Sequence, residues 1–222
     1  MVFLVPVYQP GAGLSRLVAD VREADPSGSI VLVDDGSSTP VSVPGCTVLR
    51  HEVNRGKGAA LRTGFAHIAA AHPGEPVICA DGDGQHSAED IVRIGARVRE
   101  TGHLVLGVRR VRRMPPRSRV GNAITRELFR AATGQWVRDT QTGLRGCPAS
   151  LLPWLGEVAG ERFEYEMNVL LAATRAGHPI EQVEIATTYL NGNASSHFGS
   201  VSDAARVYRA LLRFAIVDRF SL

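Results

Sequence analysis

Short apolar runs alternate with segments of helical periodicity through the first half of the chain. Five runs have the length of buried strands, namely Val2–Val7, Ile30–Val33, Thr47–Leu49, Val77–Ala80 and Leu104–Val108. Helical spacing of apolar residues lies between them, in Leu14–Val21, in Ala59–Ala71 and in Ile91–Val98 after a capping Ser87. Strands that alternate with helices predict a mostly parallel sheet covered by helices on both faces, which is the α/β fold class.

The pattern changes after Val108, where an Arg- and Pro-rich loop is expected to lead into a helix near Asn122–Thr133. Residues 139–146 are polar and turn-like. Farther along, the pattern predicts a helix over Phe163–Ala176, a strand over Val183–Tyr189 and a loop over Asn191–His197. A last helix is expected over Asp203–Phe214 and beyond. A length of 222 residues suits one large domain or two small ones.

Composition excludes several classes of protein. With 44% hydrophobic and 21% charged residues the chain is neither disordered nor fibrous, and its apolar runs are too short to span a membrane. We also expect no signal peptide, because polar and Pro residues follow the first five apolar positions. Three widely spaced cysteines exclude a disulfide framework and fit a reducing cytoplasm.

Positive charge is concentrated in one segment, although the formal net charge is only +3. Six arginines fall within eleven residues, at positions 109, 110, 112, 113, 117 and 119. Such a segment is an anion site, a membrane-facing patch or a solvated loop. It contains no aromatic residue for stacking on bases, and we therefore expect no nucleic-acid partner.

Polar residues follow four of the predicted strands directly. They are Tyr8 after the first strand, Asp34 and Asp35 after the second, Asp81-Gly82-Asp83 after the fourth and Arg109 after the fifth. Ligands of parallel sheets bind beyond the carboxyl ends of the strands. The sequence therefore predicts a binding site at this edge of the sheet.

Three of these motifs have both a chemical and a structural interpretation. Asp81 and Asp83, with an amide oxygen from Gln85, suit a hard divalent cation, but Asp and Gly also form tight turns. The pair at 34 and 35 suits a base or ribose, and the alternative is an Asx-turn. Lys57 in Asn54–Gly58 suits a phosphate at a helix N-terminus, or a glycine-permitted turn, and the segment is not a Walker A motif.

Taken together, the motifs resemble family 2 glycosyltransferases of the GT-A fold, and most closely the branch that makes polyprenyl- or dolichyl-phosphate mannose or glucose. The matching segments are Val5–Tyr8, Val33–Ser37, Asn54–Gly58, Asp81–His86, Asp139–Arg145, Phe163–Met167 and Ser195–Phe198. This resemblance implies a single GT-A domain over residues 1–222. Residues 1–108 would form its nucleotide-sugar-binding half, and residues 109–222 its acceptor-side half with a terminal amphipathic helix.

The resemblance also implies roles for individual residues in a metal-dependent, inverting transfer of a hexose. The GDP- or UDP-linked donor would contact Pro6, Tyr8, Asp34, Asp35, Lys57, Asp81 and Gly82. Mg²⁺ or Mn²⁺ would be held by Asp81, Asp83 and Gln85, and the acceptor phosphate by Arg109, Arg117, Arg119 and Arg145. The catalytic set would be Asp83, Arg109 and Asp139, the last as a base if the acceptor is a hydroxyl.

The acceptor and the location have alternatives. A polyprenyl phosphate places the protein in the cytoplasm, peripherally on the inner face of the membrane, with the terminal helix and the Arg segment on the membrane surface. A core-packed terminal helix is the alternative, and the branch also leaves open a separate membrane-protein partner. The competing functions are transfer to a saccharide or other hydroxyl and a non-catalytic nucleotide-sugar-binding module.

Overall fold

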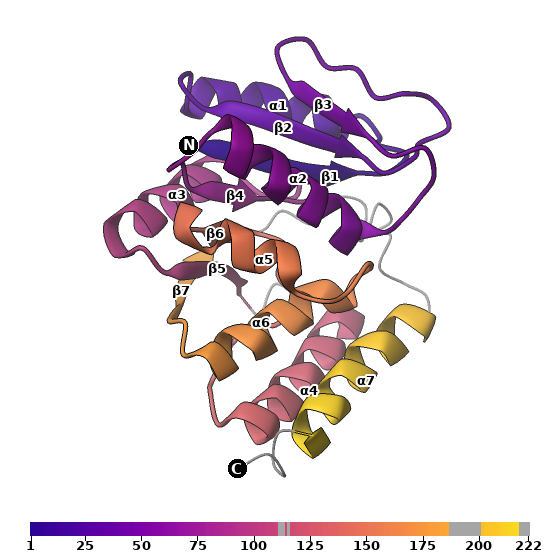
Figure 1. Cartoon of the computed structure of the whole chain (residues 1–222), viewed down its shortest axis with the longest axis vertical. Coiled ribbons are helices and arrows are strands. Elements are labelled where there is room, and N and C mark those ends of the chain that lie inside the picture. The colour runs from indigo at the N-terminus through magenta and orange to yellow at the C-terminus, as the bar shows by residue number, and fades with distance from the viewer. Residues whose placement is uncertain (111–113, 115, 187–200, 218–222) are drawn as a thin grey trace.

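The described strands form one sheet, shown in Figure 1. The computed structural model describes residues 1–110, 114, 116–186 and 201–217. The sheet has the order β3-β2-β1-β4-β6-β5-β7, and its pairs are parallel except those that β6 makes with β4 and β5. The strands are β1 (Val2–Val7), β2 (Ser29–Asp34), β3 (Thr47–Arg50), β4 (Val77–Cys79), β5 (Leu104–Arg109), β6 (Arg145–Cys147) and β7 (Ile180–Ile185).

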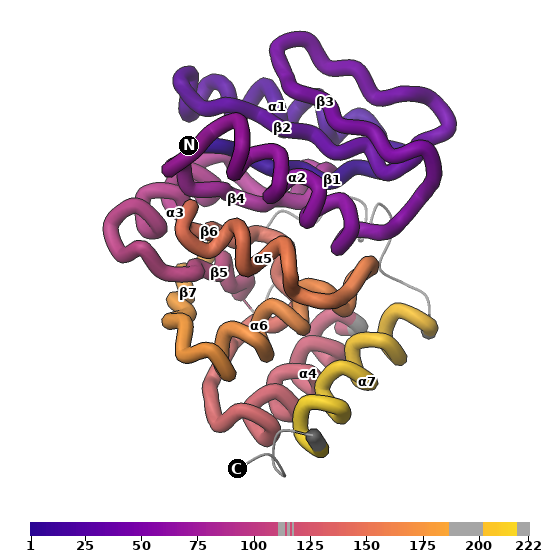
Figure 2. The backbone as a smooth tube through the Cα atoms, viewed as in Figure 1, coloured from indigo at the N-terminus to yellow at the C-terminus, as the bar shows by residue number. Residues whose placement is uncertain are grey.

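Helices cover both faces of this sheet, as the tube in Figure 2 also shows. The helices are α1 (Gly13–Ala24), α2 (Lys57–Ala71), α3 (Ala88–Thr101), α4 (Pro116–Thr133), α5 (Leu152–Glu157), α6 (Glu164–Ala176) and α7 (Val201–Val217). Helices α1 and α3 pack on one face around a core that includes Leu17 and Ile94. Helices α2, α5 and α6 pack on the other around Phe65 and Tyr165, and α4 and α7 extend this second core.

The predicted elements of the first half are confirmed, with bounds that shift by at most three residues. The continuous apolar runs form the strands because a parallel sheet covered by helices on both faces buries both sides of each strand. In β1, for example, all six residues except Pro6 are buried. The α/β class is therefore correct, and its regular βαβ start brings the ends of β1, β2 and β4 side by side.

Predictions for the second half needed several corrections. Helix α4 starts at Pro116, not near Asn122, so Arg117 and Arg119 belong to a helix and not to a loop. Proline is well tolerated in the first turn of a helix, where its missing N–H costs nothing. The segment predicted as a turn overlaps β6, an antiparallel insertion of three residues, and no pattern predicts the short helix α5.

The last predicted strand begins earlier than expected. Strand β7 spans Ile180–Ile185 and pairs with β5 from Ile180, three residues before the expected start at Val183, and residues 187–189 of the prediction lie outside the described residues. The predicted loop at Asn191–His197, the Ser195–Phe198 motif, and Arg112 and Arg113 lie outside the described residues.

Helix α7 has an inward and an outward apolar face. Val207 and Leu211 are buried where the helix packs against α4 and α6, as the core-packed interpretation expects. Leu212 and Ile216 point outward, with 55% and 61% of their surface exposed. None of the helices in the described part of the chain is long and apolar enough to cross a membrane.

The predicted cap of α3 is confirmed and gives a stability test. Ser87 adopts an extended conformation, and its Oγ accepts a hydrogen bond from the N–H of Asp90. We expect Ser87→Ala to lower the free energy of unfolding by about 1 kcal/mol, because one N–H of the first turn loses its partner. Urea denaturation measures this loss, and the exposed Ser27→Ala is the control. An unchanged midpoint would contradict the capping role.

Candidate active site

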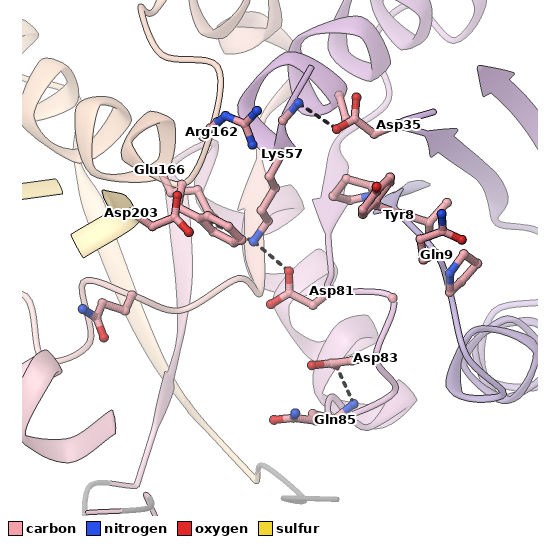
Figure 3. Close-up of a pocket in the computed structure, with 18 of the residues that line it drawn as sticks. Tyr8, Gln9, Asp35, Lys57, Asp81, Asp83, Gln85, Arg162, Glu166 and Asp203 are labelled. Carbon is pink, nitrogen blue, oxygen red and sulfur yellow. Dashed lines mark hydrogen bonds and ion pairs between the residues drawn. The ribbon is translucent and has the colours of Figure 1, made fainter. Parts of the chain in front are cut away.

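A cavity of about 860 Å³ lies beyond the carboxyl ends of β1, β2, β4 and β5. Residues of α2, α6 and α7 line its other side (Figure 3). Its volume is in the range of small-molecule and cofactor sites. The predicted site residues that line it are Pro6, Tyr8, Asp35, Lys57, Asp81, Gly82, Asp83, Gln85 and Arg109. The structure therefore brings together most of the residues that were expected at this edge of the sheet.

The two adjacent aspartates after β2 have separate places. Asp34 is fully buried, and its carboxylate accepts hydrogen bonds from the N–H groups of Ser37 and Val41 and pairs with Arg50. Burial alone would raise its pKa, but these hydrogen bonds and the nearby guanidinium lower the pKa of Asp34. Asp34 is the last residue of β2, its carboxylate holds the backbone that follows the strand, and it lies outside the cavity lining.

Asp35 lines the cavity and also fixes the loop before α2. Its Oδ1 accepts from the N–H of Arg55 at 2.9 Å and its Oδ2 from the N–H of Gly56 at 2.7 Å. His51 Nδ1 lies 2.7 Å from Oδ1, and the other ring nitrogen lies 2.9 Å from Thr63 Oγ1. Gly56 has a φ of 103°, a conformation that favours glycine. Asp35 thus holds the backbone turn that places residue 57 at the start of α2.

Lys57 bridges two carboxylates inside the cavity. Its Nζ lies 2.7 Å from Asp81 Oδ1 and 2.9 Å from Glu166 Oε2, and its side chain is only 14% exposed. Burial opposes the charged ammonium, yet the two carboxylates outweigh it and raise the pKa of Lys57 above its usual range. The lysine therefore stays positively charged at any physiological pH and links α2, the loop after β4 and α6.

Asp81 is held in one orientation by its surroundings. Burial would raise its pKa, but the charges of Lys57 and His86 lower the pKa of Asp81 to about 2. His86 Nε2 lies 4.0 Å from its Oδ2. Both carboxylate oxygens also lie against Gly143, at a place that any Cβ on residue 143 would occupy. The glycine of the 139–145 motif therefore makes room for the first aspartate of the 81–83 motif.

This close approach predicts a large effect of a small substitution. We expect Gly143→Ala to displace the Asp81 carboxylate from Lys57 and to lower turnover at least about tenfold, since a loss of 1.4 kcal/mol suffices. The measurement is nucleotide release from the donor, with thermal unfolding as a check of the fold. Gly156→Ala, where a Cβ meets open space, is the matched control. Equal turnover in both variants would contradict the assigned packing.

Asp83 and Gln85 supply oxygen atoms on the same side of the cavity. Asp83 Oδ1 accepts from the N–H of Gln85 at 3.1 Å. Burial and the neighbouring charge of Asp81 raise the pKa of Asp83. Two carboxylates that disfavour each other's charge, with an amide oxygen beside them, fit a hard divalent cation. Within the described residues, no group of three His, Cys, Asp or Glu side chains is arranged to hold a metal ion.

Arg109 and Asp139 form a bidentate ion pair. Arg109 Nε lies 2.6 Å from Oδ2 and Nη2 lies 2.9 Å from Oδ1, while the backbone N–H of Arg109 also donates to Oδ2. Asp139 is fully buried and does not line the cavity, whereas Arg109 does. The carboxylate of Asp139 thus orients the guanidinium of Arg109. Because Asp139 does not reach the cavity, it lacks the access to substrate that a general base needs.

The other predicted arginines lie elsewhere. Arg145 is buried, and its guanidinium donates to the backbone carbonyls of Thr140, Thr142 and Glu166, so the structure does not bring it to an acceptor. Arg119 is exposed on α4 and is not part of the cavity lining. Arg117 lies in the first turn of α4, and its side chain is outside the described set.

Several cavity residues were not identified from the sequence. They include Glu166, Arg162 and Asp203, to which no sequence pattern assigns a role in the site. All three line the cavity, from α6 and its preceding loop and from α7. The Phe163–Met167 motif was the one signal that pointed to this region, but only the fold shows which of its side chains faces Lys57.

The structure aligns with a GT-A glycosyltransferase over most of its length. The solved structure is glucosyl-3-phosphoglycerate synthase from Mycobacterium tuberculosis with phosphoglyceric acid, at a TM-score of 0.70 and 19% identity, covering 96% of this chain and 79% of that one. At this identity the likeness establishes the fold. The family model described as glycosyl transferase family 2 matches residues 2–149. The chain therefore belongs to glycosyl transferase family 2 and is a glycosyltransferase.

Curated relatives extend this comparison. An uncharacterised protein of Methanocaldococcus jannaschii is 31% identical over 72% of this chain and 70% of its own length. UDP-N-acetylglucosamine–dolichyl-phosphate N-acetylglucosaminyltransferase of Methanococcus voltae is 30% identical over 64% of this chain and 59% of its own. Undecaprenyl-phosphate 4-deoxy-4-formamido-L-arabinose transferase of Sodalis glossinidius is 30% identical over 64% of this chain and 47% of its own. The chain thus spans about half the length of the two named transferases.

Proposed function

We propose that this protein transfers a hexose from a GDP- or UDP-linked donor to a polyprenyl phosphate, with inversion and with the help of Mg²⁺ or Mn²⁺. The observation that carries the proposal is the Arg109–Asp139 pair, which presents a fixed guanidinium at the cavity and keeps the carboxylate of Asp139 away from it. A guanidinium suits a phosphate acceptor, and a hydroxyl acceptor needs an accessible base.

The names of two relatives support a lipid phosphate acceptor. One acts on a dolichyl phosphate and the other on an undecaprenyl phosphate, according to their descriptions. These two proteins differ in the sugar that they transfer, so their shared feature is the class of acceptor. The donor sugar of this chain is left open by the relatives, and the proposal commits only to a hexose on GDP or UDP.

The chemistry of the acceptor fits the groups that line the cavity. A phosphate monoester is largely dianionic near neutral pH, because its second pKa is about 6. It therefore attacks the donor's anomeric carbon without a general base, provided that positive charge brings the two anions together. Arg109 supplies this charge on the acceptor side, and Lys57 supplies it at the N-terminus of α2, where a diphosphate is favoured.

Asp83 and Gln85, with Asp81, are the residues that would hold the divalent cation. When bound, such a cation neutralises the leaving diphosphate. The protein's own contribution is to hold Asp81 between Gly143 and Lys57 and to keep Asp83 within the cavity. Tyr8 and Pro6 at the end of β1 form the neighbouring wall, where the nucleoside is expected.

A lipid acceptor also requires contact with a membrane surface. The outward Leu212 and Ile216 of α7, and Val120 and Ile124 of α4, are at least 46% exposed. Exposed arginines lie on the same two helices. Apolar side chains with basic neighbours suit the boundary of an anionic membrane. We infer a peripheral association with the cytoplasmic face on this basis.

The test is a transfer assay with each candidate donor. Purified protein is incubated with Mg²⁺ or Mn²⁺, a panel of GDP- and UDP-sugars, and a short polyprenyl phosphate in lipid vesicles. We expect nucleotide release that requires both the cation and the lipid phosphate, and a product with inverted anomeric configuration. Release without the lipid, stimulated by a saccharide, would favour a hydroxyl acceptor. Donor binding without turnover would favour a binding module, and a retained configuration would reject direct displacement.

A further inference from the structure

Lys57 is the only lysine in the chain, among 25 Lys and Arg residues. It stands at the cavity, at the first position of α2. Lysine differs from arginine in carrying a compact charge on a flexible stem, and it can exchange one oxygen partner for another without the planar geometry that a guanidinium requires. A lysine at position 57 can therefore change its oxygen partner inside the cavity in a way that an arginine cannot.

The partners of Lys57 form a row of alternating charges across the cavity floor. Arg145 donates to the backbone carbonyl of Glu166 at 2.7 Å, and its Nε lies 3.7 Å from Glu166 Oε1. The other oxygen, Oε2, lies 2.9 Å from Lys57 Nζ, and Lys57 lies 2.7 Å from Asp81 Oδ1. Arg145 thus holds Glu166 in place, and Glu166 positions the ammonium of Lys57 against Asp81. Figure 3 shows Glu166, Lys57 and Asp81.

The ammonium of Lys57 therefore contacts Asp81 Oδ1, an oxygen atom that the divalent cation also needs. Asp81 Oδ1 faces Lys57, and both oxygens of its carboxylate pack against Gly143. The described residues contain no ready group of three acidic, His or Cys ligands elsewhere in the cavity. A cation at this place must depend on oxygen atoms from Asp81, Asp83, Gln85 and the donor's own phosphates.

We propose that Lys57 and the divalent cation compete for the carboxylate of Asp81, and that the donor's diphosphate ends this competition by taking the ammonium as its partner. The inference rests on the proposed function for the identity of the donor. Without donor, Lys57 neutralises Asp81 and the cation binds weakly. With donor, the diphosphate binds Lys57 at the N-terminus of α2, and the ammonium releases Asp81 Oδ1 to the cation. Nucleotide and cation then strengthen each other's binding by the same factor.

The first test measures Mn²⁺ binding without nucleotide, by the electron paramagnetic resonance signal of the free ion. We expect Lys57→Met to bind Mn²⁺ about tenfold more tightly than the wild type, because a competing charge is gone. Lys57→Arg keeps a competing cation and is expected to resemble the wild type. Arg55→Met removes an exposed charge two residues away and is the control for general electrostatics. Unchanged binding in Lys57→Met, or equal tightening in Arg55→Met, would overturn the proposal.

A second test uses the wild type and does not depend on the folding of a variant. Protein labelled with ¹³C-lysine gives one Hε–Cε signal, since Lys57 is the only lysine. We expect this signal to stay in place with Mg²⁺ alone and to move when UDP or GDP is added with Mg²⁺. Movement to the same final position with Mg²⁺ alone would show that the ammonium is released without the donor, and would overturn the role that the proposal gives to the diphosphate.

The two tests separate this inference from the proposed function. If calorimetry shows that UDP or GDP binds while Lys57→Met leaves Mn²⁺ affinity unchanged, the competition is wrong and the donor assignment stands. If neither nucleotide binds while Lys57→Met tightens Mn²⁺ binding, the competition is supported and the donor assignment fails.

Discussion

Asp83→Asn is expected to lower turnover about a thousandfold while the protein stays folded. The carboxylate of Asp83 lies in the cavity beside Asp81 and Gln85, and the proposed cation needs its charge. Asparagine keeps an oxygen atom in the place that accepts the N–H of Gln85, so the turn is retained. The measurement is metal-dependent nucleotide release at saturating donor and lipid phosphate. Asp20→Asn, an exposed carboxylate on α1, is the control.

The same substitution is expected to stabilise the metal-free protein at neutral pH. Burial and the charge of Asp81 raise the pKa of Asp83, so its ionised form opposes folding above that pKa. Below the ordinary carboxyl pKa of about 3.9 the aspartate is protonated in both folded and unfolded chains, and the advantage of asparagine disappears. Urea denaturation of wild type and variant at pH 7 and at pH 3.5 measures this. A turnover-competent Asp83→Asn would refute the cation assignment.

The second large effect is expected at the Arg109–Asp139 pair. Asp139→Asn or Arg109→Met leaves one charge buried without its partner and should lower the free energy of unfolding by about 3–5 kcal/mol. The double variant Arg109→Met/Asp139→Asn removes both charges and is expected to recover most of this stability. Urea denaturation of the four proteins measures the coupling between the two residues.

Acceptor binding is expected to separate from stability in these variants. Arg109→Met and the double variant should raise the KM for the lipid phosphate at least about tenfold, because a charge-assisted contact is lost, with the KM for the donor little changed. Asp139→Asn keeps the guanidinium but loses its orientation, and we expect an intermediate value. A stable double variant with a normal acceptor KM would show that Arg109 serves the fold and not the acceptor.

The outcome at residues 34 and 35 shows how far local pattern predicts a site. Both aspartates follow a buried strand, and the sequence places both at the binding edge of the sheet. The backbone then divides them: Asp34 turns toward Ser37 and Arg50, while Asp35 faces the cavity and the loop before α2. Adjacent residues of an extended chain point to opposite sides, and which side holds the ligand depends on what packs there.

The approximate places of the first five strands along the chain, the capping Ser87 and the family of the chain were determined by the sequence alone. Periodicity and capping are local properties, because they depend on residues a few positions apart. The motifs at 34–37 and 81–86 follow predicted strands directly, the motif at 54–58 precedes a predicted helix, and this order carried the expectation of a GT-A glycosyltransferase. Motif order and strand pattern therefore sufficed for the class of protein and for the side of the cavity at the strand ends.

Tertiary structure alone decided which charges meet. Lys57 and Glu166 are 109 positions apart, and Arg109 and Asp139 are 30 apart, so no local spacing pairs them. The antiparallel β6 joins the two halves of the sheet through a run of three residues that resembles a turn in sequence. Contacts of this kind arise when packing brings distant side chains into one low-dielectric space, where a buried charge must find a partner.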